Sequence, residues 1–239
     1  MASQGNSGDG ERKLKVLGLH GGGSNTNIMQ FQTQALQRAI GKDVEWDFMN
    51  GERPWQSPIH HPVLVTLAKD MPFYGWYGVV VDDDSDRPYE EKLFDLSVRI
   101  TYEDVELAVE RVMNHITENG PFDALVGFSQ GCIVIHLVTA ILRQRGEEIP
   151  WKLSILFCGM RVRDQRYIDL FTTPMQHPAI MVFGKQDEFY EYGKTSQMEM
   201  YEAPMVLEHD EGHKFPSARP RAKEIYDAIA EELRRCCAS

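Results

Sequence analysis

The residues Gly127-Phe128-Ser129-Gln130-Gly131 form a G-x-S-x-G pentapeptide at the end of the apolar run 124–128. Serine in this pattern is a candidate nucleophile, because the two glycines let the chain turn sharply and lift the hydroxyl out of the sheet edge. The amphipathic stretch 130–145 supplies the helix that such a turn must enter. The alternative, a tight turn with an incidental serine, does not require this strand-turn-helix setting.

A serine hydroxyl is a weak nucleophile and needs a base that is oriented by a third group. In hydrolases built on this type of sheet, a carboxylate and then a histidine follow the serine along the chain. Two histidines come late enough and close to a strand end, His209 and His213. We predict His213 as the base, since it lies in the loop before the last helix and Gly212 frees that loop. His209 is expected to be a buried histidine at the strand end.

Asp187 is the predicted acid, because it comes directly after the apolar run 180–184 and so lies at the carboxyl end of a strand. Asp210 is the competing carboxylate. It is so close in sequence to His213 that it is poorly placed to reach back to the imidazole.

The third requirement is a pair of N–H donors for a developing oxyanion. The amide of Gln130 follows the serine and opens a helix, where it has no internal partner. The segment 19–25, Leu-His-Gly-Gly-Gly-Ser-Asn, follows a neighbouring strand, and its glycines can turn a second N–H inward. We predict Gly22 as this donor, with Gly21 and Gly23 as near alternatives.

Other chemistries fit these residues less well. The glycines do not match a dinucleotide fingerprint or a phosphate-binding P-loop. His209 and His213 are four residues apart and could share a helix face to hold zinc, but Gly212 weakens a helix there and no glutamate follows the first histidine. We therefore predict no metal and no organic cofactor.

Apolar and amphipathic segments alternate along most of the chain, which indicates an α/β fold. We expect a mostly parallel sheet of about six strands with helices on both faces, in one domain over 13–239. The predicted strands are 14–20, 44–49, 124–128, 153–158, 180–184 and 205–208. The predicted helices are 27–40, 101–119, 130–145 and 219–235, and Thr101 with Asp104 resembles a capping box that opens the second.

The stretch around 51–100 departs from this alternation. It contains five prolines, an acidic run at 82–84, and clustered aromatic residues. Such a long irregular stretch predicts a functional insertion, such as a lid or binding loop, although a decorated surface insertion is the simpler alternative. Its aromatic residues are the predicted apolar substrate contacts: Phe73, Tyr74, Trp76 and Tyr77.

Composition limits the partners. The 239 residues carry 25 Lys and Arg against 36 Asp and Glu, a net charge of -11, which disfavours nucleic acid, anionic membranes and, unless a local field overrides it, highly anionic substrates. The uncharged stretch 124–142 is broken by polar residues and glycines, so we expect no membrane insertion.

Residues 1–12 predict a disordered tail without a signal peptide. The four cysteines do not resemble a secreted disulfide framework, which indicates a reduced, cytoplasmic protein; Cys236 and Cys237 are either an acylation site or a frayed end.

Taken together, the motifs resemble those of the FSH-type serine hydrolases, a family of small carboxylesterases with the α/β-hydrolase fold. The resemblance covers about 13–233 and depends on the segments 19–25, 120–123, 127–131, 184–187 and 209–216. It implies a triad of Ser129, Asp187 and His213, with Gly22 and Gln130 as the oxyanion hole. At the positions of Gly22 and Gly23, family members often carry bulkier residues. This chain also lacks the arginine that often precedes the family's aromatic segment. Both differences bear on substrate choice.

The predicted function is therefore hydrolysis of a small-molecule acyl ester, with a medium or long acyl chain, through an acyl-enzyme on Ser129. The resemblance also allows release of acyl chains from carrier-bound or protein-bound thioesters, since the same triad attacks either bond. A more remote alternative is a binding protein of this fold with an idle triad.

Overall fold

The computed structural model describes residues 12–56 and 62–238. Its centre is a six-stranded parallel sheet in the order β10-β9-β8-β7-β1-β2, which confirms the predicted α/β architecture. The strands are β1 (Leu14–Leu19), β2 (Val44–Met49), β7 (Ala124–Phe128), β8 (Leu153–Phe157), β9 (Ala179–Gly184) and β10 (Met205–His209). Most of the predicted 1–12 tail lies outside the described residues, while Arg12 forms an ion pair with Asp123.

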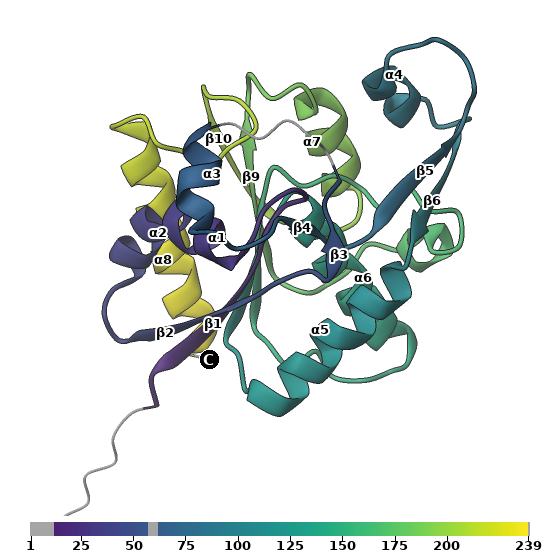
Figure 1. The fold of residues 1–239 in the computed structure, drawn as a ribbon. Coiled ribbons are helices and arrows are strands. Elements are labelled where there is room, and N and C mark those ends of the chain that lie inside the picture. The colour runs from purple at the N-terminus through teal and green to yellow at the C-terminus, as the bar shows by residue number, and fades with distance from the viewer. Residues whose placement is uncertain (1–11, 57–61, 239) are drawn as a thin grey trace, which may run out of the picture.

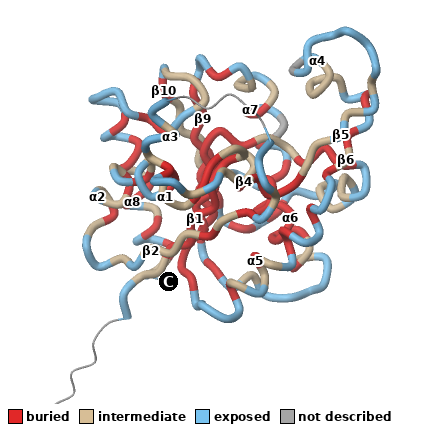
Figure 2. Tube along the Cα trace, viewed as in Figure 1, coloured by how far each residue is buried: buried red, intermediate tan, exposed pale blue. Residues whose placement is uncertain are grey.

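The inner strands read as continuous apolar runs because both faces of the sheet are covered. Every residue of β7, β8 and β9 is buried, as expected for strands of a parallel sheet between two helical layers. Figure 2 shows these strands as the buried centre of the molecule. Because all six strands are parallel, their carboxyl ends meet at one edge, where side chains from distant parts of the chain come together.

The helices form two layers (Figure 1). One layer consists of α1 (Thr26–Gln32), α2 (Gln34–Ile40) and α8 (Arg221–Cys237), which pack on the face that presents Val16, Val126 and Ile180. The other consists of α5 (Val105–Asn119) and α6 (Gln130–Gln144), over Leu17, Leu125 and Leu156. The remaining helices of the described chain are α3 (Pro62–Ala68), α4 (Tyr89–Phe94), the short 3₁₀ helix η1 (Ile168–Phe171) and α7 (Tyr190–Met198). None of the helices in this described part is both long and apolar enough to cross a membrane.

Two element predictions were wrong. The helix expected over 27–40 is two helices that meet at Thr33, whose buried hydroxyl donates to the carbonyl oxygens of Met29 and Gln30, a type of side-chain bond that bends helices. The capping box at Thr101 and Asp104 does not form. Thr101 lies in a strand, and Asp104 precedes α5 in a left-handed conformation without a side-chain cap.

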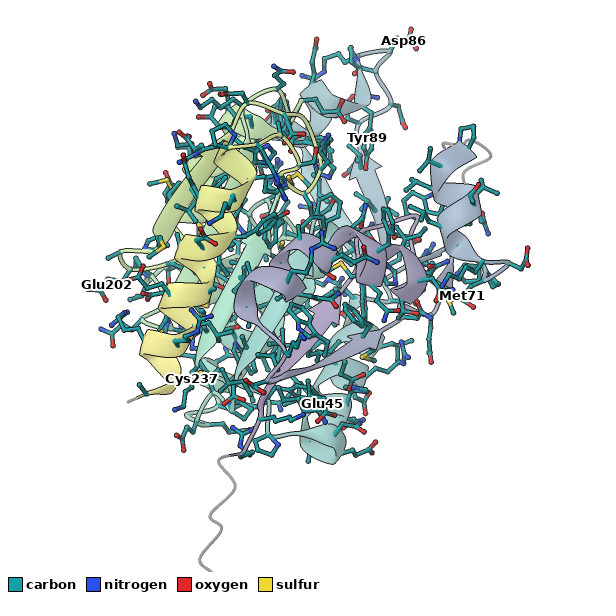
Figure 3. The ribbon with its side chains drawn as sticks, turned by 90° about the vertical axis from the view of Figure 1, so that its left-hand side faces the viewer. Glu45, Met71, Asp86, Tyr89, Glu202 and Cys237 are labelled. Carbon is teal, nitrogen blue, oxygen red and sulfur yellow. The ribbon has the colours of Figure 1, made fainter. Side chains whose placement is uncertain are left out.

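The stretch 51–100 is built mainly of short elements rather than one long loop. β3 (Arg53–Pro54) pairs with β4 (Tyr74–Gly75), and β5 (Gly78–Asp82) pairs with β6 (Arg99–Glu103) in an antiparallel hairpin. This hairpin extends away from the central sheet and carries α4 at its end (Figure 1). Figure 3 shows Asp86 at the outer tip of the hairpin and Tyr89 nearer the body of the molecule.

Candidate active site

Ser129 lies between β7 and α6, at the corner that its sequence pattern predicts. Its backbone has φ 49° and ψ -113°, a conformation that a residue with a side chain adopts only under strain. The glycine two residues later permits this corner, because a Cβ on Gly131 would overlap the carbonyl oxygen of Leu19. The turn therefore brings Ser129 against the end of β1.

Asp187 and His213 come together from the loops after β9 and β10. The His213 Nδ1 lies 2.7 Å from Asp187 Oδ2, and the other carboxylate oxygen accepts a hydrogen bond from the Phe189 amide at 2.9 Å. Burial alone would raise the pKa of Asp187, but the hydrogen bond from His213 and the amide bond lower it below its usual value. The carboxylate stays ionised and holds the imidazole with its proton on Nδ1, so that Nε2 can accept a proton.

Aromatic rings fix the plane of the His213 imidazole. The ring of Phe128, the residue before Ser129, lies 5.1 Å from it, and the ring of Phe189 meets it edge-on at 5.6 Å. These contacts place His213 at the same sheet edge as Ser129.

The two competing residues lie elsewhere. His209 is buried at the end of β10 and neither ring nitrogen has a hydrogen-bond partner within the described chain. Burial lowers the pKa of His209, so its ring is neutral. Asp210 is exposed and forms an ion pair with Lys185 at 3.0 Å. It is Asp187, rather than Asp210, that contacts His213.

Cys158 is a member of this cluster that sequence reasoning missed. It follows β8 with φ 49°, is buried, and donates its thiol proton to the Lys214 carbonyl at 3.6 Å, while its Sγ lies within 4.8 Å of the ligand atoms of Asp187 and His213. Its position one residue past a buried strand is the only sequence signal that could have pointed to it. Within the described residues, the one group whose ligand atoms lie close enough to hold a metal ion is this same set of Cys158, Asp187 and His213.

The two predicted oxyanion donors lie beside the serine. Gly22 and Gln130 line the same cavity as Ser129, and neither backbone N–H donates to another group in the described part of the chain. His20 holds the loop 21–23, which carries the three glycines. Its ring donates to the Gly21 carbonyl at 2.6 Å and accepts from the Gly51 amide at 3.0 Å. Burial lowers the pKa of His20 to about 4, so the ring is neutral and can make both bonds.

The cavity beside Ser129 has a volume of about 210 Å³. Its wall is mostly apolar and aromatic and comes largely from the β5–β6 hairpin, α4 and the segments after β8 and β9. The lining residues beyond Gly22, Ser129 and Gln130 are Trp55, Tyr77, Val79, Tyr89, Leu93, Ile100, Tyr102, Met160, Arg161, Arg163, Phe189 and Tyr192.

Of the four aromatic residues predicted to contact substrate, only Tyr77 lines this cavity. Trp76 is buried and donates its indole N–H to the His20 carbonyl at 2.7 Å. Tyr74 pairs its backbone with Ser24, and the carbonyl of Phe73 accepts from the Trp55 amide. These three residues hold the loop 21–23 and the β3–β4 pair in place, so they support the site without lining its cavity.

The family model described as serine hydrolase (FSH1) matches residues 10–225. A protein named family of serine hydrolases 3 from Saccharomyces cerevisiae is 28% identical over 240 residues, covering 91% of this chain and 84% of its own. The protein named esterase OVCA2 from Xenopus tropicalis is 23% identical, covering 93% and 95%.

Solved structures agree on the fold. The crystal structure of esterase PE8 superimposes with a TM-score of 0.61 at 17% identity, covering 95% of this chain and 94% of that one. The structure of SOBER1 from Arabidopsis thaliana gives a TM-score of 0.58 at 16% identity, covering 94% and 99%. Because the family model spans nearly the whole chain, this protein belongs to the serine hydrolase (FSH1) family.

Proposed function

We propose that the protein is a carboxylic ester hydrolase that works through an acyl-enzyme on Ser129. The observation that carries this proposal is the 2.7 Å hydrogen bond between His213 and Asp187, at the sheet edge where the strained Ser129 corner also lies. A nucleophile, a base and an orienting carboxylate at one edge are the parts that acyl transfer needs.

In this mechanism, His213 Nε2 removes the hydroxyl proton as Ser129 Oγ attacks the acyl carbonyl. Asp187 keeps the other ring proton on Nδ1 and stabilises the imidazolium that forms. When the tetrahedral intermediate collapses, the bond to the alcohol oxygen breaks and His213 gives its proton to the leaving alcohol. Water then attacks the acyl-enzyme with the same base, which releases the acid and restores the serine.

The N–H groups of Gly22 and Gln130 are proposed to bind the developing oxyanion. The Gln130 amide also lies at the N-terminus of α6, where the helix dipole favours negative charge. Each such donor contributes on the order of 3 kcal/mol in the transition state.

The cavity indicates the size of the substrate. Its volume of about 210 Å³ is below the range of about 300–1,000 Å³ that is usual for drug-sized ligands. Together with its aromatic wall, this favours an acyl or alcohol group of short to medium length. A thioester remains the second candidate, because the same residues attack either bond; a matched pair of oxygen ester and thioester with one acyl chain decides which is hydrolysed faster.

The test of the proposal is labelling with a fluorophosphonate, followed by mass spectrometry of the modified peptide. We expect label on Ser129 that survives EDTA and disappears in Ser129→Ala. Ser85→Ala, at an exposed serine of the hairpin, is the matched control and should leave labelling unchanged. Folded protein that takes no label, or a Ser129→Ala variant that still hydrolyses esters, contradicts the proposal; unlabelled folded protein favours the idle binding protein.

A further inference from the structure

The cavity beside Ser129 has a charge opposite to that of the whole chain. Two arginines, Arg161 and Arg163, line it, and no Asp or Glu is among its described lining residues. The chain as a whole has 36 acidic residues against 25 Lys and Arg. Cations that collect in one cleft of an acidic protein create a local field that attracts anions.

Arg163 is buried, with 4% of its surface exposed, and has no carboxylate partner among the described residues. Its guanidinium donates to the backbone carbonyl oxygens of Leu93, Asp95 and Val98 at the end of α4. These bonds satisfy the guanidinium donors, and the Tyr192 ring lies 5.9 Å from the guanidinium, but no carboxylate of the described residues neutralises the positive charge. A buried charge of this kind is costly unless something opposes it.

A nearby arginine shows that the loop after β8 can supply counter-charges. Arg166, three residues further along, pairs with Asp164 at 2.6 Å and also with Glu106. Arg166, which is not among the lining residues of the cavity, therefore has close carboxylate partners, whereas Arg163 has none among the described residues and Arg161 has only a more distant one.

Arg161 is the more exposed of the two cavity arginines. Its side chain is 25% exposed, and its only ion pair within the described chain is a 3.7 Å contact with the exposed Glu199. It makes no hydrogen bond to the described residues. The planar fork of N–H donors of arginine matches the two oxygens of a carboxylate, so Arg161 has unused donors of the type that bind one.

We infer that the ester substrate of this enzyme carries a carboxylate, which Arg161 binds at the cavity while Arg163 adds to the positive field. This inference rests on the proposed ester hydrolysis and adds a substrate class to it. The carboxylate can belong to the acyl part, as in a half-ester of a dicarboxylic acid, or to the leaving alcohol. The net charge of the chain argues against anionic substrates only at long range, because the cavity field acts over the last few ångströms.

The experiment compares two pairs of esters that differ only in charge. The first pair is mono-4-nitrophenyl adipate and its methyl ester, which place the charge on the acyl part. The second is 4-acetoxybenzoate and its methyl ester, which place it on the leaving group. The measured quantity is the ratio of kcat/KM for the anionic and neutral member, in the wild type and in Arg161→Gln; intrinsic reactivity cancels when the ratios are compared.

For at least one pair, we expect Arg161→Gln to lower the anionic-to-neutral ratio by about tenfold or more, the effect of losing a hydrogen bond to a charged group. Arg161→Lys should keep part of the preference. Arg38→Gln, on the exposed surface of α2, removes the same charge at a distance and should leave the ratio unchanged. Added salt should reduce the wild-type ratio.

An unchanged ratio in Arg161→Gln for both pairs overturns the inference. The same holds if Arg38→Gln lowers the ratio as much as Arg161→Gln does. Hydrolysis of neutral esters that depends on Ser129, without an effect of Arg161, refutes only the substrate class. Folded wild-type protein that hydrolyses none of the four esters and takes no fluorophosphonate label refutes the proposed function and this inference with it.

Discussion

The buried thiol of Cys158 lies beside the carboxylate of Asp187 and lowers the pKa of that carboxylate. Its Sγ lies within 4.8 Å of the ligand atoms of both Asp187 and His213. Asp187 thus receives hydrogen bonds from a ring nitrogen and the Phe189 amide and has the thiol beside it, and each of these neighbours favours the ionised form.

The first prediction concerns this thiol. Cys158→Ala removes a neighbouring thiol that lowers the pKa of Asp187, so the pKa of the carboxylate should rise and the acidic limb of the kcat/KM profile should move to higher pH. We expect kcat/KM at neutral pH to fall about fivefold, the effect of one ordinary hydrogen bond. Cys158→Ser keeps a donor and should restore both properties. Equal profiles for the alanine and serine variants would show that the thiol acts only by packing.

The second prediction tests the orienting carboxylate. Asp187→Asn keeps the size of the side chain but favours the wrong tautomer of His213, and kcat should fall by about 10⁴-fold while the fold is retained. Asp210→Asn is the matched control, because Asp210 is a nearby carboxylate that pairs with Lys185. Steady-state kinetics together with circular dichroism check both variants. Similar losses in the two would contradict the assigned role of Asp187.

The third prediction concerns Glu211, which anchors the loop that carries His213. Its carboxylate accepts hydrogen bonds from the Ser217 amide at 2.7 Å and the Ala218 amide at 3.0 Å. Burial alone would raise the pKa of Glu211, but the bonds from Lys214 and Ser217 lower it from 4.5 to about 2. Because the folded-state pKa is the lower one, this stabilisation is present above about pH 4.5 and is lost as the pH falls toward 2.

Glu211→Gln should therefore lower the free energy of unfolding by about 1 kcal/mol at pH 7, discounted for partial exposure. The difference from the wild type should shrink as the pH approaches 2. Urea unfolding at several pH values measures it. A difference that does not depend on pH would mean that the loss comes from geometry and not from charge.

The fourth prediction uses the strain at Ser129. Glycine tolerates the backbone of this corner (φ 49°, ψ -113°) and alanine does not. Ser129→Gly should therefore be more stable to unfolding than Ser129→Ala by about 1–2 kcal/mol, although both variants should be inactive. Thermal unfolding of the two proteins provides the comparison. If alanine is as stable as glycine there, the corner is not strained.

The central sheet and the serine corner could be predicted because their signals are local. β7, β8 and β9 are short apolar runs whose residues are all buried, and their short length between turn signals identifies such runs as strands. The corner adds two glycines at fixed spacing around Ser129, which no surface turn requires.

The insertion could not be predicted in the same way. Thr101 lies in β6 because that strand pairs with β5, with Val80 opposite Thr101, and such pairing is not visible in a local window. The local sequence around Thr101 and Asp104 favours a helix start, but the pairing of β6 with β5 outweighs this local preference. Thr33 shows the converse: the apolar period continues across it, yet the chain forms two helices that meet there, and the Thr33 side chain bonds within its own helical turn.

The residues of the cavity wall could be predicted least well from the sequence. The cluster of aromatic residues at 73–77 suggested substrate contacts, yet Trp76 turns inward to bond the His20 carbonyl. Arg161 and Arg163 carry no motif, and only the fold brings them to the cavity. Local sequence patterns identify candidate catalytic residues because these lie next to strand ends. They do not identify the cavity wall, because its residues come from many separate segments.

In the proposed mechanism, the residues that react with the substrate and the residues of the cavity wall that would contact it belong to different parts of the fold. Ser129, Asp187 and His213 stand on loops of the central sheet, whereas Val79, Tyr89 and Leu93 of the cavity wall come from the hairpin and α4. The hairpin extends outward with an exposed tip (Figure 2), so it can lengthen or shorten without altering the register of β7. In evolutionary terms, this gives the scaffold a region where substrate range can diverge between lineages while the acyl-transfer chemistry is inherited unchanged.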